Sequence, residues 1–203
     1  QKKPREIAQE IVSQLKTDLK IFSKIEIAGP GFINFFYAPP YLQDTVSSIL
    51  KEGNSFGKID FGKDQKAQVE FVSANPTGPL TIGHGRQAVL GDTIANLLEW
   101  SGFKVIREYY FNNAGRQMRV LGDSVRLRYH ELCSQPVNFP EDYYQGQYIV
   151  DIAQTIKEIH SEALLHLSEE ELTIFVETAE NQIFNDIKKT LGQLGIQFDV
   201  YFN

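Results

Sequence analysis

The residues with the clearest capacity for chemistry lie between positions 69 and 86, where a histidine follows a run of small and polar residues. Val69 to Val72 has the composition of a short strand, and residues 73–79 are turn formers. A helical pattern then runs from about Gly85 to Trp100. This order is typical of a phosphate-binding crevice, because a helix start offers unpaired N–H groups and the positive end of its dipole. His84, where the loop becomes the helix, can donate a hydrogen bond to a phosphate oxygen or a reacting carboxylate.

Three further polar residues lie at or just beyond the carboxyl end of the predicted strand. Ser73 and Asn75 follow it directly, where open α/β sheets bind their ligands, although both residue types are also common in turns. Glu70, within the strand, suits a planar guanidinium because a carboxylate pairs with it through two parallel hydrogen bonds. An outward-facing charge on the strand explains Glu70 equally simply.

Composition bounds the class of protein. The chain has 203 residues, of which 42% are hydrophobic and 23% charged, and these values are typical of a soluble globular protein. The net charge of −6 argues against a generally basic nucleic-acid binder. The single cysteine, Cys133, fits a reducing, cytoplasmic location, and no membrane span is expected. No Cys/His cluster has the spacing of a metal site.

Residues 1–62 are expected to form a separate small α+β domain. Periodicity and turn signals predict a helix at 4–20, strands at 22–28 and 32–37, a helix from about 41 to 51, and a linker at 53–62.

Residues 63–203 predict the first part of a Rossmann-like α/β domain. The predicted elements are strands at 68–72, 104–111 and 196–202 and helices at about 85–100, 114–131, 148–160 and 169–191. The strand–helix–strand unit implies parallel pairing, and the helices at about 130–190 are expected to be an insertion into the sheet domain. Ser168 and Glu171 have the spacing of a capping box.

The segment Pro79-Leu-Thr-Ile-Gly-His84 resembles the His-Ile-Gly-His motif of class I aminoacyl-tRNA synthetases. Its context, Ser73-Ala-Asn-Pro-Thr-Gly-Pro79 before and Gly85-Arg86 after, resembles the arginyl-tRNA synthetases in particular. Phe111-Asn-Asn-Ala-Gly-Arg-Gln-Met118 resembles a second segment of that family, with Asn113 where aspartate is common. Thr81 departs from the motif, because a threonine replaces the first histidine and carries no positive charge.

The resemblance implies a role for each matching residue. It implies catalytic roles for His84 and Thr81, and no metal ligands. It implies an arginine site at Glu70, Ser73, Ala74, Asn75 and His84. It implies an ATP site at Gly78, Pro79, Leu80, Thr81, Ile82, Gly83, His84 and Gly85. Mg²⁺ would accompany ATP without a protein ligand. The N-terminal domain would contact the elbow of the tRNA.

The implied activity is that of an arginine–tRNA ligase, in which ATP activates L-arginine and the arginyl group passes to tRNA(Arg). The chain starts without methionine and ends within a strand-like pattern, so it is expected to be the N-terminal fragment of a cytoplasmic, monomeric enzyme and to be inactive alone. The Lys-Met-Ser-Lys-Ser-like loop of class I enzymes is absent from it. A small nucleotidyltransferase, or an RNA-binding module without catalysis, remains an alternative.

Overall fold

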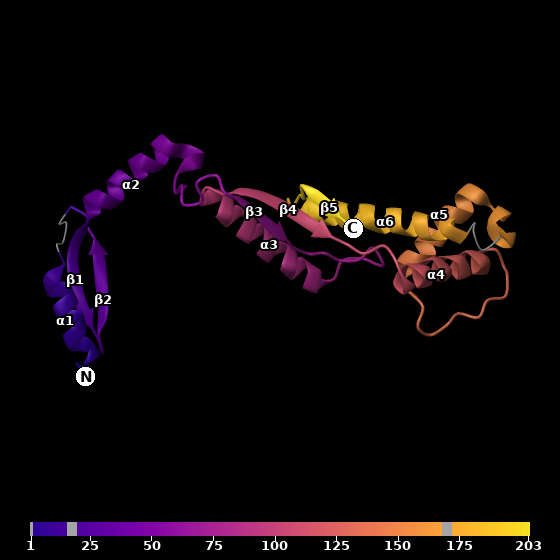
Figure 1. The fold of residues 1–203 in the computed structure, drawn as a ribbon, viewed down its shortest axis with the longest axis horizontal. Helices are drawn as coiled ribbons and strands as arrows, with labels where there is room; N and C mark the ends of the chain where they lie inside the picture. Colours follow the sequence, from indigo (N-terminus) through magenta and orange to yellow (C-terminus); the bar gives the residue numbers. More distant parts are fainter. Residues whose placement is uncertain (1, 16–19, 168–171) are drawn as a thin grey trace. The chain divides into compact units, whose positions relative to one another are not determined.

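The computed structural model describes residues 2–15, 20–167 and 172–203. The chain divides into two compact units, Gln1–Lys58 and Ile59–Asn203. Both units combine helices with strands, which confirms the predicted α/β class (Figure 1). Within the described ranges, no helix has the length and apolar character needed to cross a lipid bilayer.

The first unit pairs an antiparallel hairpin with two helices. Helix α1 (Pro4–Gln14) precedes strands β1 (Phe22–Ala28) and β2 (Phe32–Tyr37), and helix α2 (Pro39–Glu52) follows them. The side chain of Arg5 donates a hydrogen bond to the Gly29 carbonyl at 2.8 Å, which ties α1 to the hairpin turn. The first helix is shorter than predicted, because Leu15 is already extended, with ψ 120. Residues 16–19 of that prediction lie outside the described residues, and Lys20, its last residue, lies in a turn.

The second unit contains a parallel sheet in the order β3-β4-β5, with β4 in the middle. The strands are β3 (Lys66–Glu70), β4 (Lys104–Tyr110) and β5 (Val200–Phe202). Strand β5 is shorter than the predicted 196–202. Ile196 instead donates its N–H to the carbonyl of Leu191, after Gly195 at φ 75, so residues 195 and 196 close the preceding helix.

Helix α3 (Ile82–Trp100) connects β3 to β4 and packs closely on the sheet. A Cβ added at Gly91 would lie 2.2 Å from Phe71, so only glycine permits this approach. Arg107 of β4 binds α3 through Glu99 at 2.6 Å and Asp92 at 3.3 Å. The Glu99 hydrogen bond is the main cause that raises the pKa of the guanidinium. These contacts fix the helix, and therefore its N-terminus, relative to the strands.

Three helices pack together beyond the sheet, as Figure 1 shows: α4 (Arg116–Leu132), α5 (Gln147–His160) and α6 (Thr173–Gln193). Their fully buried side chains continue the core formed by the sheet, and they include Leu121, Val125, Tyr129, Ile149, Ile152, Ile156, Phe175 and Ile187. Helix α6 returns the chain to β5. The predicted capping box at Ser168 and Glu171 lies outside the described residues.

Candidate active site

The start of helix α3 carries the residues of the predicted motif. The helix begins at Ile82, three residues before the predicted start at Gly85, because Thr81 and His84 form a capping box. The Nδ1 atom of His84 accepts a hydrogen bond from the Thr81 backbone N–H at 3.1 Å and lies 3.2 Å from the Thr81 hydroxyl. Since Nδ1 accepts a hydrogen bond, Nε2 is the ring atom that carries a proton to donate. The helix start also presents the backbone N–H groups of Ile82 and Gly83. These groups have no carbonyl acceptor within the helix, because no helical turn precedes them.

Ser73 holds Glu70 at the end of strand β3. The Ser73 hydroxyl donates to the Glu70 carboxylate at 2.6 Å and accepts the Tyr110 backbone N–H at 3.2 Å. The chain turns sharply here, since Val72 and Ser73 have φ values of 65 and 44. This turn ends the strand at Glu70, two residues earlier than predicted, and fixes the carboxylate beside β4.

Tyr109 clamps the next residue of the loop. Its hydroxyl donates to the Ala74 carbonyl at 2.8 Å and accepts the Ala74 N–H at 3.1 Å. The ring is fully buried, and burial raises the pKa of Tyr109 to about 12. The hydroxyl therefore stays protonated and keeps both bonds across the ordinary pH range. Sequence reasoning missed this residue, because the pattern of a strand does not reveal a bond to a residue 35 positions earlier.

Asn75 is bound on both sides of its amide. Its Nδ2 donates to Gln117 of α4 at 3.1 Å, and its Oδ1 accepts the Asn112 backbone N–H at 2.9 Å. Asn113 lies beside this group and donates to Glu180 of α6 at 2.8 Å. Asn75 therefore joins the loop after β3 to the segment after β4, and Gln117 is brought into the site.

Tyr148 of α5 holds the other end of the loop. Its hydroxyl donates to the Thr77 carbonyl at 2.9 Å, and burial raises the pKa of Tyr148. Gly78 passes so close that an added Cβ would lie 3.1 Å from the Tyr148 hydroxyl. The predicted helix begins at Tyr148, but nothing in its sequence pattern indicated a contact with this loop.

The structure gathers only part of the predicted site into one cleft. A cleft of about 410 Å³ is lined by Ala74, Asn75, Thr77, Gly78, Pro79, His84, Gln117, Tyr144 and Tyr148. Glu70 and Ser73 line a separate groove of about 480 Å³ along α3, together with Leu90 and Ile94. The remaining predicted ATP residues, which line neither concavity, are Leu80, Thr81, Ile82, Gly83 and Gly85.

The charged residues of the described part of the chain do not form a metal centre. No group of three or more His, Cys, Asp or Glu residues there has the arrangement needed to hold a metal ion. The residues near the cleft therefore do not fit a resident metal, and its polar groups are amides, hydroxyls, backbone N–H groups and one imidazole.

Comparison with known protein families identifies the family of this chain. The family model described as tRNA synthetases class I (R), catalytic domain, matches residues 45–202. The chain belongs to the arginyl-tRNA synthetase family. A second model, the arginyl tRNA synthetase N terminal domain, matches residues 1–37. The resemblance found in the motif is therefore confirmed at the level of the family.

Individual synthetases match over nearly the whole chain. Arginine–tRNA ligases from Chlorobaculum parvum and Chlorobium phaeovibrioides are 54% and 52% identical over 202 residues, which cover 100% of this chain. The chain spans 36% of the length of each relative. A Campylobacter jejuni arginyl-tRNA synthetase structure matches 79% of this chain and 35% of its own, with a TM-score of 0.71 and 38% identity. The Thermus thermophilus structure, at 21% identity and a TM-score of 0.52, shares the fold over 98% of this chain and 32% of its own.

Proposed function

We propose that the whole protein is an arginine–tRNA ligase, which activates L-arginine with ATP and transfers the arginyl group to tRNA(Arg). The observation that supports this most directly is the cleft in which Asn75, Gly78 and His84 come together, in a chain of the arginyl-tRNA synthetase family. The chain spans only 36% of its relatives, so the activity is proposed for the whole protein.

In the first step, an oxygen of the arginine carboxylate attacks the α-phosphorus of ATP. A new P–O bond forms, the bond to the β-phosphate breaks, and pyrophosphate leaves with its electron pair. No covalent enzyme intermediate is required, so catalysis consists of positioning the reactants and stabilising charge on the phosphate. His84 donates a hydrogen bond from Nε2 to a phosphate oxygen, and Thr81 fixes the orientation of the His84 ring. The N-terminus of α3 stabilises the negative charge of the phosphate.

The residues before helix α3 bind the arginine substrate. Glu70 faces the guanidinium of arginine, and Ser73 orients that carboxylate through its 2.6 Å hydrogen bond. Asn75 binds the carboxylate end with the second hydrogen of its Nδ2, because the first is given to Gln117, and Ala74 lines the arginine site beside it. The nucleotide follows residues 78–85, with Mg²⁺ held by its phosphates. A terminal ribose hydroxyl of the tRNA then attacks the arginyl carbonyl and releases AMP.

The first unit is proposed to contact the elbow of the tRNA in a cytoplasmic, monomeric enzyme. Two aromatic side chains of β2 support this, since Phe32 is 69% exposed and Phe36 is 44% exposed. Lys24 lies 5.5 Å from the centre of the Phe36 ring, but its ammonium group also forms an ion pair with Glu26. The support therefore comes from the rings, because exposed rings are suited to stacking unpaired bases.

Arginyl-tRNA formation by the full-length protein tests the proposal, with L-lysine as the competing amino acid. Product with arginine but not with lysine supports it, and no product with either in the presence of ATP and tRNA(Arg) refutes it. The 203-residue chain alone is expected to form no arginyl-tRNA. Its melting temperature should nevertheless rise with arginine and not with lysine if residues 70–75 already select the substrate.

A further inference from the structure

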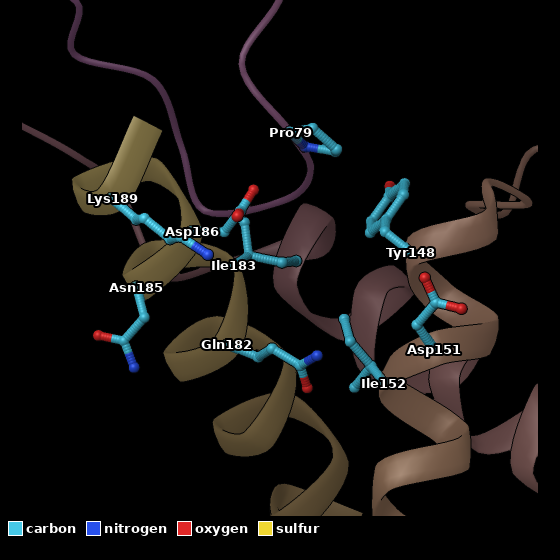
Figure 2. A pocket seen from close by; sticks show the side chains of 9 residues that line it. All are labelled: Pro79, Tyr148, Asp151, Ile152, Gln182, Ile183, Asn185, Asp186 and Lys189. Atoms are coloured by element: carbon cyan, nitrogen blue, oxygen red, sulfur yellow. The ribbon is translucent and has the colours of Figure 1, made fainter. Parts of the chain in front are cut away.

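A second pocket lies between helices α5 and α6, beside the cleft of the motif. It has a volume of about 400 Å³. Figure 2 shows Tyr148, Asp151 and Ile152 of α5 facing Ile183 and Asp186 of α6, with Pro79 at one end. Gln182, Asn185 and Lys189 complete the lining. Because Pro79 and Tyr148 also line the cleft, the two spaces share a wall.

The polar groups of this pocket are available to a ligand. Within the described residues, the side chains of Gln182, Asp186 and Lys189 have no hydrogen bond or ion pair. The Asp151 carboxylate accepts one hydrogen bond, from Gln147 at 3.0 Å, and keeps further acceptor positions. Two carboxylates against one ammonium group give the pocket an excess of negative charge.

The apolar groups of the same pocket suit a flat ring. The aromatic ring of Tyr148 and the buried aliphatic side chains of Ile152 and Ile183 provide the surfaces against which a ring packs. The volume is in the range of small-molecule sites. The carboxylates accept hydrogen bonds from hydroxyl groups, and the amide of Gln182 both donates and accepts.

We propose that the pocket between α5 and α6 binds a nucleoside, whose ribose hydroxyls donate to Asp186 and Asp151 while its base packs against Tyr148, Ile152 and Ile183. A phosphate-rich ligand is disfavoured by the two carboxylates. The inference rests on the proposed function, since that reaction brings two nucleosides to the neighbouring cleft. One is the terminal nucleoside of the tRNA, and the other is the nucleoside of ATP.

The test uses the full-length protein and the exposed Asp186. Asp186→Asn keeps the shape of the side chain and removes its charge, and Glu177→Gln makes the same change at an exposed site on α6 outside the pocket. Equilibrium dissociation constants are measured for ATP, for tRNA(Arg), and for the same tRNA without its last nucleoside. Loss of one hydrogen bond to a carboxylate is expected to weaken binding about tenfold.

If the tRNA supplies the nucleoside, Asp186→Asn weakens binding of intact tRNA and leaves the shortened tRNA unchanged. If ATP supplies it, ATP binding weakens and both tRNAs are unaffected. The proposal is overturned if no dissociation constant changes, if both tRNAs weaken equally, or if Glu177→Gln has the same effect. Arginylation by the wild-type protein is measured in parallel, so that failure of the proposed function is seen separately from failure of this pocket assignment.

Discussion

Replacing Tyr109 by phenylalanine tests whether one buried hydroxyl stabilises the loop that follows β3. That group donates to the carbonyl of Ala74 at 2.8 Å and accepts its N–H at 3.1 Å, and both residues are buried. Tyr109→Phe keeps the ring but leaves two backbone groups without partners where water has little access. Each such group costs about 1–3 kcal/mol, so the loss of both partners should lower the free energy of unfolding by about 2–6 kcal/mol.

Chemical denaturation monitored by circular dichroism measures this change, and the melting temperature should fall by roughly 5–25 °C. Tyr201→Phe is the matched control, because Tyr201 packs against Tyr109 at 5.5 Å between ring centres and its hydroxyl has no hydrogen-bond partner within the described residues. The reasoning is refuted if Tyr109→Phe loses no more stability than Tyr201→Phe.

The same residue predicts a dependence on alkaline pH. The pKa of Tyr109 is raised from 10.0 to about 12 in the folded state, mainly by burial. Because this pKa is higher in the folded state than in the unfolded state, the Tyr109 hydroxyl contributes its full stabilisation of the fold below pH 10. That contribution is lost as the pH rises from 10 to 12. Stability measured across this window should therefore fall less steeply in Tyr109→Phe than in the wild type. Equal slopes would show that the Tyr109 hydroxyl does not titrate with unfolding.

Three further changes test the site and the first unit. In the full-length protein, His84→Ala should lower the rate of arginyl-adenylate formation about 100-fold, measured by pyrophosphate exchange, and an unchanged rate would exclude the Nε2 donor. Gly78→Val should weaken ATP binding, measured by calorimetry, because even a Cβ would lie 3.1 Å from the Tyr148 hydroxyl; unchanged affinity would place ATP elsewhere. Phe32→Ala should weaken tRNA binding about tenfold in a filter-binding assay, while Leu50→Ala, at a 79% exposed side chain, should not; equal effects would rule out specific stacking.

The position of the site was predictable because it depends on local patterns. The run of strand formers before Ser73 and the helical period after His84 placed these residues at the carboxyl edge of a sheet, where the structure has them. The start of the helix was misjudged by three residues, because a histidine three positions after the N-cap is not among the usual capping residues.

The supports of the loop were not predictable, because they join residues far apart in the sequence. Tyr109 binds Ala74 across 35 positions, and Tyr148 binds Thr77 across 71. A tyrosine in a strand or a helix has the same local pattern whether its hydroxyl meets water or a backbone carbonyl. The separation of Glu70 from the cleft likewise follows from the turn at Val72, which periodicity does not reveal.

The turn at Val72 also bears on how this protein would respond to selection for heat resistance. A β-branched residue at φ 65 costs roughly 1–2 kcal/mol relative to glycine. The Val72 side chain is, however, only 5% exposed and packs in the core, which stabilises the fold by about 1.5–3 kcal/mol, so glycine at this position would bring no net gain in stability. The same change would widen the range of conformations open to Ser73 and Glu70. Laboratory evolution under heat and selection for discrimination between arginine and lysine should therefore both retain valine at position 72.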